Sequence, residues 1–175
     1  MVSEKMQAAF CDQINRELYS EYLYLSMVAY FDDLGLKGFA HWMRVQTKEE
    51  HTHAMMMFTH LGTAGGKVTL QPIAGPPTTF ESPLAVFEAT LEHERFITAN
   101  INALLDQALG ERDHASAAFL QWFVTEQVEE EAAAKELVDT LRLIGGQGQG
   151  LLMLDRELGA RVFNLPAAAA AMGIL

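Results

Sequence analysis

The chain has 175 residues, half of them hydrophobic, and a formal net charge of −11. These values fit one globular domain with a sizeable core and exclude an intrinsically disordered chain. The acidic excess attracts cations and excludes nucleic acid as a partner, because nucleic-acid binding depends on Lys and Arg residues that neutralise phosphates.

Four long helices and no strand are predicted, which makes the fold class all-α. Ser3 suits an N-cap, Pro83 suits a first helical position, and glycines stand at or just beyond the end of each helix. Long helices joined by short turns pack antiparallel in a bundle. The predicted helices cover residues 3–33, 37–61, 83–110 and 113–144.

The connection between the second and third helices, residues 63–82, is rich in Pro and Gly and has no helical period. At about 3.3 Å per extended residue it is long enough to run the full length of a helix of this size. We therefore expect a crossover that makes the second and third helices parallel. This connection occurs in some four-helix bundles.

Beyond the bundle the sequence predicts a short amphipathic fifth helix over residues 153–163 and an apolar tail over residues 166–175, after the loop GGQGQG. A short amphipathic helix outside a complete bundle needs another surface to cover its apolar side. We assign residues 1–175 to a single domain, with the bundle over residues 3–144.

The single Cys11 cannot form an internal disulfide, which fits a reducing compartment. The N-terminal stretch MVSEKMQAAF carries charges where an export signal would need an apolar core. No apolar run approaches the roughly 20 residues that cross a bilayer. We expect a cytoplasmic protein with no membrane partner.

The inward-facing row of each long helix is apolar at both ends and acidic near its middle. The acids in these rows are Glu17 and Glu21, Glu50, Glu94 and Glu130. Counted along the bundle at 1.5 Å per residue, one acid from each helix lies in a layer roughly 8 Å deep. Burying an unpaired carboxylate costs several kcal/mol, and no Lys or Arg falls in this layer. The acids are therefore either protonated or bound to a cation.

His53 favours the cation. It follows Glu50 by three residues, so both side chains can reach one ion from the same face of a helix. An imidazole beside carboxylates suits iron, manganese or zinc better than calcium. Four Glu and one His can supply two ions, with Glu50 and Glu130 placed to bridge them. A hydrogen-bonded polar layer without metal is the simpler alternative, which the alignment of five residues at one depth disfavours.

These residues lie in stretches that resemble the non-haem prokaryotic ferritins. The resemblance rests on ELYSEYLYLSM (residues 17–27), KEEHTH (48–53), Glu94 and FLQWFVTEQVEEE (119–131), and it extends over about residues 5–163. It implies a ferritin-like bundle and an iron-storage protein that assembles with itself into a 24-subunit shell of octahedral symmetry. It also implies a ferroxidase, which oxidises Fe(II) to Fe(III) with dioxygen or hydrogen peroxide and deposits ferric mineral in the shell.

The resemblance further implies two iron ions per subunit, and a third nearby. The first ion would be held by Glu17, Glu50 and His53; the second by Glu94 and Glu130, with Glu50 bridging and Gln127 close by; the third by Glu49, Glu126, Glu129 and Glu130. Without the resemblance, the run EQVEEE would be interpreted as a solvated acidic face. Tyr24 corresponds to a tyrosine beside the centre that could donate an electron.

The sequence differs in two places from the patterns of related di-iron proteins, and both differences favour a non-haem ferritin. Helix four offers Gln127 and Glu130 where symmetric di-iron bundles carry a second Glu-x-x-His motif. Thr52 stands where bacterioferritins carry their haem-binding Met, so no haem is expected. A non-catalytic storage subunit and a rubrerythrin-like enzyme are the alternatives. One cysteine cannot build the Cys-rich electron-transfer module of rubrerythrin-like enzymes.

The other candidate ligands receive structural interpretations. Met55, Met56 and Met57 point around the helix and are expected to pack. Asp113 and His114 could line a channel of a shell. The histidines expected at the surface are His41, His51, His60, His93 and His114.

Overall fold

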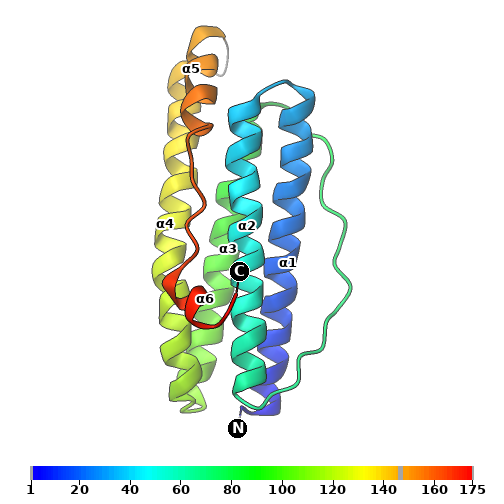
Figure 1. Ribbon diagram of the computed structural model, residues 1–175, viewed down its shortest axis with the longest axis vertical. Coiled ribbons are helices and arrows are strands. Elements are labelled where there is room, and N and C mark those ends of the chain that lie inside the picture. The colour runs from blue at the N-terminus through cyan, green and yellow to red at the C-terminus, as the bar shows by residue number, and fades with distance from the viewer. Residues whose placement is uncertain (1, 146–147, 175) are drawn as a thin grey trace.

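The computed structural model describes residues 2–145 and 148–174. Within these ranges the chain folds into four long helices and two short ones, with no strand (Figure 1). The long helices are α1 (Glu4–Asp33), α2 (Lys37–Thr63), α3 (Pro83–Gly110) and α4 (His114–Ile144), and the short ones are α5 (Gly148–Leu158) and α6 (Ala167–Ala171). The predicted all-α bundle is confirmed. Gly146 and Gln147 of the predicted GGQGQG loop, like Met1 and Leu175, lie outside the described residues.

Side-chain caps, of which Ser3 was predicted, explain why three of the long helices begin where they do. The hydroxyl oxygens of Ser3 and Ser82 accept hydrogen bonds from the backbone N–H groups three residues later, at 3.0 and 3.1 Å. Asp113 Oδ1 accepts one from Ser116 N at 3.1 Å. These bonds satisfy donors that have no partner within the helix. At the other end, α4 stops at Gly145, whose φ of 69° is left-handed and favours glycine.

Helix α2 is capped differently, by a residue from α5. Its N-cap position, Leu36, provides no side-chain hydrogen bond. Asp155 Oδ1 instead accepts hydrogen bonds from Gly38 N at 2.8 Å and Phe39 N at 3.1 Å. A Cβ atom on Gly38 would lie 1.5 Å from the Asp155 carbonyl oxygen, so only glycine permits this approach.

The predicted bounds of the fifth helix, 153–163, differ from those of α5, which spans Gly148–Leu158. Its inward row consists of Leu154 and Leu158, which are buried, and the partly buried Leu151, so the apolar period starts earlier than predicted. After the turn at Gly159, the chain runs extended back along the bundle to the short α6 (Figure 1).

Residues 64–82 form the expected crossover. This segment contains no helix and runs along α1 from one end of the bundle to the other (Figure 1). Asn15 on α1 fixes it by donating to the carbonyl oxygens of Gln71 and Pro72 at 3.3 and 3.2 Å. Helices α2 and α3 therefore run parallel, while α1–α2 and α3–α4 are antiparallel pairs.

Two apolar clusters fill the two ends of the bundle and leave a polar layer between them. One cluster is centred on Phe31, Phe39 and Phe87, and the other on Phe10 and Phe123. Full burial of one such side chain stabilises the fold by about 1.5–3 kcal/mol. The clusters therefore offset the cost of an acidic layer at mid-height.

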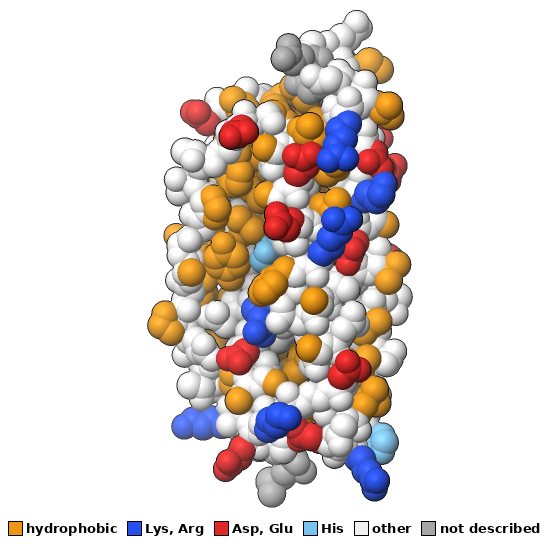
Figure 2. Space-filling view, turned by 180° about the vertical axis from the view of Figure 1, so that it is seen from behind, with side chains coloured by type: hydrophobic (Ala, Val, Ile, Leu, Met, Phe, Trp, Pro, Cys, Tyr) orange, Lys and Arg blue, Asp and Glu red, His pale blue; other side chains and the backbone are white. Residues whose placement is uncertain are grey.

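The surface carries both apolar and charged features. Figure 2 shows hydrophobic side chains spread over one part of a face and Lys and Arg interspersed with Asp and Glu along another. Exposed apolar side chains include Tyr22 and Leu25 on α1 and Leu70 and Ile73 in the crossover. No helix in the described part of the chain has the length and apolar character to span a membrane.

Candidate metal centre

Each long helix contributes one acid to the polar layer. Glu17 from α1, Glu50 from α2, Glu94 from α3 and Glu130 from α4 are exposed by only 1, 2, 2 and 6 %. The structure thus brings the four predicted acids together. It does not include Glu21, which is half-buried and forms an ion pair with His51 at 3.1 Å. The helix turns every 3.6 residues, and this repeat buries Ser20 in place of Glu21.

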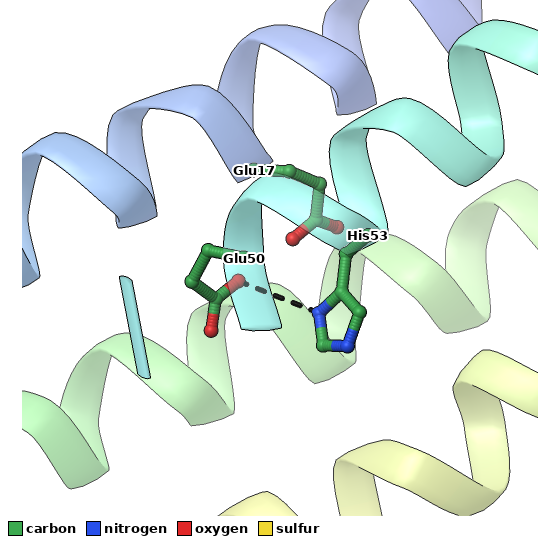
Figure 3. Close-up of side chains that lie close together, drawn as sticks. All are labelled: Glu17, Glu50 and His53. Atoms are coloured by element: carbon green, nitrogen blue, oxygen red, sulfur yellow. Dashed lines mark ion pairs between the residues drawn. The ribbon is translucent and has the colours of Figure 1, made fainter. Parts of the chain in front are cut away.

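Two groups of these side chains are close enough to hold an ion. In the first, ligand atoms of Glu17, Glu50 and His53 all lie within 4.8 Å of one another. Figure 3 shows both carboxyl groups and the imidazole directed toward one point, with His53 Nδ1 3.5 Å from Glu50 Oε2. In the second group, His53, Glu126 and Glu130 meet the same criterion. The first group corresponds to the predicted first iron position. The second group combines His53, predicted for the first iron, with Glu126 and Glu130, predicted for the third.

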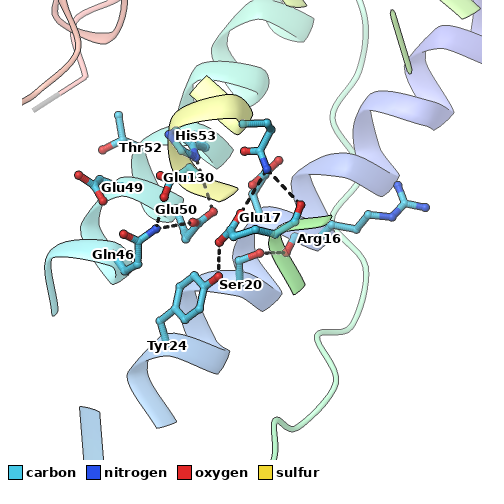
Figure 4. Close-up of polar contacts among 12 residues, drawn as sticks. Arg16, Glu17, Ser20, Tyr24, Gln46, Glu49, Glu50, Thr52, His53 and Glu130 are labelled. Carbon is cyan, nitrogen blue, oxygen red and sulfur yellow. Dashed lines mark hydrogen bonds and ion pairs between the residues drawn. The ribbon is translucent and has the colours of Figure 1, made fainter. Parts of the chain in front are cut away.

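Amide side chains orient the acids. Gln13 donates to Glu17 Oε1 and Gln46 to Glu130 Oε2, both at 2.8 Å. Figure 4 shows Gln46 between Glu50 and Glu130. Neither glutamine was predicted as a site residue, although Gln13 stands one helical turn before Glu17 and Gln46 one turn before Glu50. That spacing is the signal that could have identified them.

Glu94 has two donors of its own. The Tyr24 hydroxyl donates to its Oε1, and Gln127 Nε2 donates to its Oε2 at 3.2 Å. The predicted neighbours of the centre, Tyr24 and Gln127, therefore both contact Glu94. The amide hydrogen bonds show that part of the layer is satisfied without metal, as the simpler alternative requires. Among the described residues, however, Glu17 Oε2 is buried and has no hydrogen-bond partner. Such a buried oxygen without a partner is suited to bind a cation.

Burial controls the protonation of the layer. Desolvation raises the pKa of Glu17 to about 7. It raises the pKa values of Glu50 and Glu130 well above their usual range, and the nearby Glu94 carboxylate raises them further. Desolvation also lowers the pKa of His53 to about 4, so its ring is neutral at pH 7. A neutral imidazole is the form that binds metal, and a cation that binds the carboxyl groups would displace any protons they carry into solvent.

The acids predicted for the third position are only partly gathered. Glu126 is half-buried beside His53 and Glu130, while Glu129 is exposed. Glu49 forms an ion pair with Arg161 at 2.6 Å. Arg161 was not singled out in the sequence, where it falls inside the predicted fifth helix; the structure ends α5 at Leu158, so Arg161 lies in the segment that follows.

The remaining histidines divide into two kinds. His51 and His114 are exposed, as predicted, but His41, His60 and His93 are half-buried. His93 Nε2 lies 2.7 Å from Ser20 Oγ, and the His60 ring stacks on Phe119 with centroids 4.0 Å apart. The surface prediction was wrong for these three: side chains from other helices contact the rings of His60 and His93, and His41 contacts the Arg161 carbonyl oxygen after α5.

Residues 7–144 match the ferritin family, described as a ferritin-like domain. The chain belongs to the ferritin family. It is 44% identical over 161 residues to a bacterial non-heme ferritin of Bacteroides fragilis, covering 92% of this chain and all of that one. A bacterial non-heme ferritin of Campylobacter jejuni is 40% identical over 158 residues, or 90% of this chain and 95% of that one.

A solved structure shares the fold. It is a novel open pore ferritin from the hyperthermophilic archaeon Archaeoglobus fulgidus, which matches with a TM-score of 0.92 and 52% identity and covers 93% of this chain and all of that chain. Together these similarities confirm the predicted resemblance and the ferritin-like fold. Family membership supports iron storage as the role of the chain.

Proposed function

We propose that the protein is an iron-storage ferritin with ferroxidase activity. The observation that carries the proposal is the buried layer of Glu17, Glu50, Glu94 and Glu130 with His53. Within the described residues, none of these acids forms an ion pair with Lys or Arg. Four buried acids without a cation are costly, and a metal ion would remove that cost.

The ligand types support oxidation of iron. Carboxylate oxygens are hard donors that stabilise Fe(III) relative to Fe(II), so they ease the loss of an electron. Two Fe(II) ions held side by side can give two electrons to one dioxygen and, with two protons, yield hydrogen peroxide. Hydrogen peroxide could itself serve as the oxidant. Oxygen-rich ligation then lets Fe(III) leave for a mineral store.

The proposed ligand sets are those that the family resemblance implies. The first iron would bind Glu17, Glu50 and His53, whose convergence supports this position. The second would bind Glu94 and Glu130, with Glu50 bridging and Gln127 close by. The third would bind Glu49, Glu126, Glu129 and Glu130. Tyr24 would donate an electron from its place beside Glu94, and no haem is proposed.

We propose assembly into a 24-subunit shell in the cytoplasm. Exposed apolar side chains support a contact between subunits: Tyr22 and Leu25 lie on α1, and Leu152 and Met153 lie on α5. A contact between subunits would remove these side chains from water. The likeness to a solved ferritin over almost the whole chain supports the same conclusion.

Aerobic mixing of the metal-free protein with Fe(II) tests the activity. The protein should accelerate the formation of ferric species, and Glu50→Ala should remove most of the acceleration. Equal rates with and without protein would leave only a non-catalytic storage subunit. Light scattering gives the mass of the assembly, and a mass far below that of 24 subunits would favour a rubrerythrin-like enzyme over a storage shell.

A further inference from the structure

Arg161 in the extended segment after α5 is held against α2 through several contacts. Its Nη2 atom lies 2.6 Å from Glu49 Oε2, and its Nη1 donates to the Trp42 carbonyl oxygen at 3.3 Å. Its guanidinium carbon lies 4.3 Å from the centroid of the Trp42 ring. His41 Nε2 lies 2.7 Å from the Arg161 carbonyl oxygen and fixes the backbone. A carboxylate, a carbonyl oxygen and an aromatic ring together fix the place of the Arg161 guanidinium.

The ion pair is sheltered. The side chains of Arg161 and Glu49 are exposed by only 22 and 18 %, so water screens the pair less than it would at an open surface. The segment that carries Arg161 returns along the bundle beside α2 and α4 (Figure 1). It thus places one positive charge at the edge of the acidic layer.

Glu49 is a proposed ligand of the third position, yet its carboxylate is engaged elsewhere. Within the described residues, the group that converges beside this position consists of His53, Glu126 and Glu130, without Glu49. Figure 4 shows Glu49 on the side of α2 away from Glu17. Its nearest cation is the Arg161 guanidinium, which takes up one of its two oxygens.

We propose that Arg161 is a positioning residue that holds Glu49 when the third position is empty and competes with the cation that binds there. The inference rests on the proposed function, because the third position is part of it. A guanidinium and a divalent cation are both attracted to the Glu49 carboxylate, so a cation that binds Glu49 competes with the ion pair. Arg161 therefore lowers the affinity of the third position for iron, so iron bound there dissociates more readily.

Zinc titration by calorimetry of the full-length metal-free protein tests this proposal, because Zn²⁺ binds such ligands without a redox step. The wild type should show two tighter ions and one weaker ion per subunit. Arg161→Gln should tighten the weakest class about tenfold, since the competing ion pair is gone. Arg161→Lys, which keeps the charge but loses the planar fork, should lie in between.

Two controls separate this role from general damage. Arg156→Gln removes an exposed arginine of α5 and should change no affinity. In a Glu49→Gln background, Arg161→Gln should have no effect on zinc affinity, because the carboxylate for which the two cations compete is absent. Circular dichroism verifies that every variant is folded.

The proposal is overturned if Arg161→Gln leaves the weakest class unchanged or weakens it, or if it acts equally in the Glu49→Gln background. Measuring Fe(II) oxidation by the same wild-type sample distinguishes a failure of this proposal from a failure of the proposed ferroxidase function. A wild type that accelerates Fe(II) oxidation while Arg161→Gln leaves zinc binding unchanged refutes only the role of Arg161. A wild type that accelerates nothing refutes the ferroxidase itself.

Discussion

Asp155 on α5 accepts hydrogen bonds from the backbone N–H groups of Gly38 and Phe39, although Asp155 and Gly38 are 117 residues apart. A side-chain cap usually comes from the residue that directly precedes its helix. Here a short helix beyond the bundle performs that role for α2. The bundle and the C-terminal segment are therefore coupled in their stability.

Gly38→Ala should destabilise the metal-free protein by about 1–3 kcal/mol, because the new methyl group would overlap the Asp155 backbone and displace α5. Urea unfolding measures the difference. Gly62→Ala is the matched control on the same helix, since a Cβ there meets nothing within 4 Å. It should leave stability unchanged or raise it by up to about 1 kcal/mol. Equal effects of the two substitutions would contradict the docking of α5.

Glu50→Gln should lower the rate of Fe(II) oxidation by more than about tenfold while the protein stays folded, because the amide keeps the volume of the side chain but is a poor metal ligand. Stopped-flow absorbance of ferric species measures the rate. Glu92→Gln changes an exposed acid on α3 and should keep the wild-type rate. A Glu50→Gln protein as fast as wild type would exclude Glu50 as a ligand.

Stability of the metal-free protein should depend on pH through Glu17. Burial raises its pKa to about 7 from an ordinary value of 4.5. Its contribution is thus fully present below pH 4.5 and is lost as the pH rises through 7. Glu17→Gln should therefore gain stability relative to wild type between pH 5 and pH 8, by at most roughly 3 kcal/mol. His53 acts in the opposite direction, since its pKa is lowered to about 4, and the comparison of variants cancels its contribution.

Urea unfolding at the two pH values tests this prediction. Glu81→Gln, a change of an exposed acid, should show the same difference from wild type at both values. If the advantage of Glu17→Gln does not grow with pH, Glu17 is ionised in the folded protein throughout.

Metal binding should release protons. Burial raises the pKa values of Glu50 and Glu130 well above their usual range, so in the metal-free protein these carboxyl groups retain protons to higher pH than exposed ones do. A cation must displace these protons, so zinc affinity should increase as the pH rises from 6 to 8. Calorimetry in buffers of different ionisation enthalpy counts the protons. Identical heats in all buffers at pH 7 would mean that the carboxyl groups are already ionised.

Local signals explain which parts of the fold could be predicted. The caps at Ser3, Ser82 and Asp113 act within four residues, so α1, α3 and α4 begin at or next to the predicted residue. The acidic layer followed from spacing along single helices and one assumption about the crossover. The bounds of α5 did not follow, because they depend on how its leucines and Asp155 meet α2 across the chain.

The contacts between side chains within the site were harder to predict from the sequence. Spacing places Glu126 on the correct helix but does not say that its carboxyl group meets His53 and Glu130. Glu21 was assigned inward because it follows Glu17 by four residues, but Ser20, which follows Glu17 by three, is the residue that the helix buries. Arg161 was placed in the predicted fifth helix, and its ion pair with Glu49 joins residues 112 positions apart, which spacing along one helix cannot reveal.

The crossover divides the molecule into two hairpins joined by one extended strand of chain. The first hairpin supplies Glu17, Glu50 and His53, and the second supplies Glu94, Gln127 and Glu130. The proposed first position therefore lies wholly within the first hairpin, whereas the second takes ligands from both hairpins. A protease cut within residues 64–82 would yield two fragments. Iron bound by ligands from both fragments would strengthen their association.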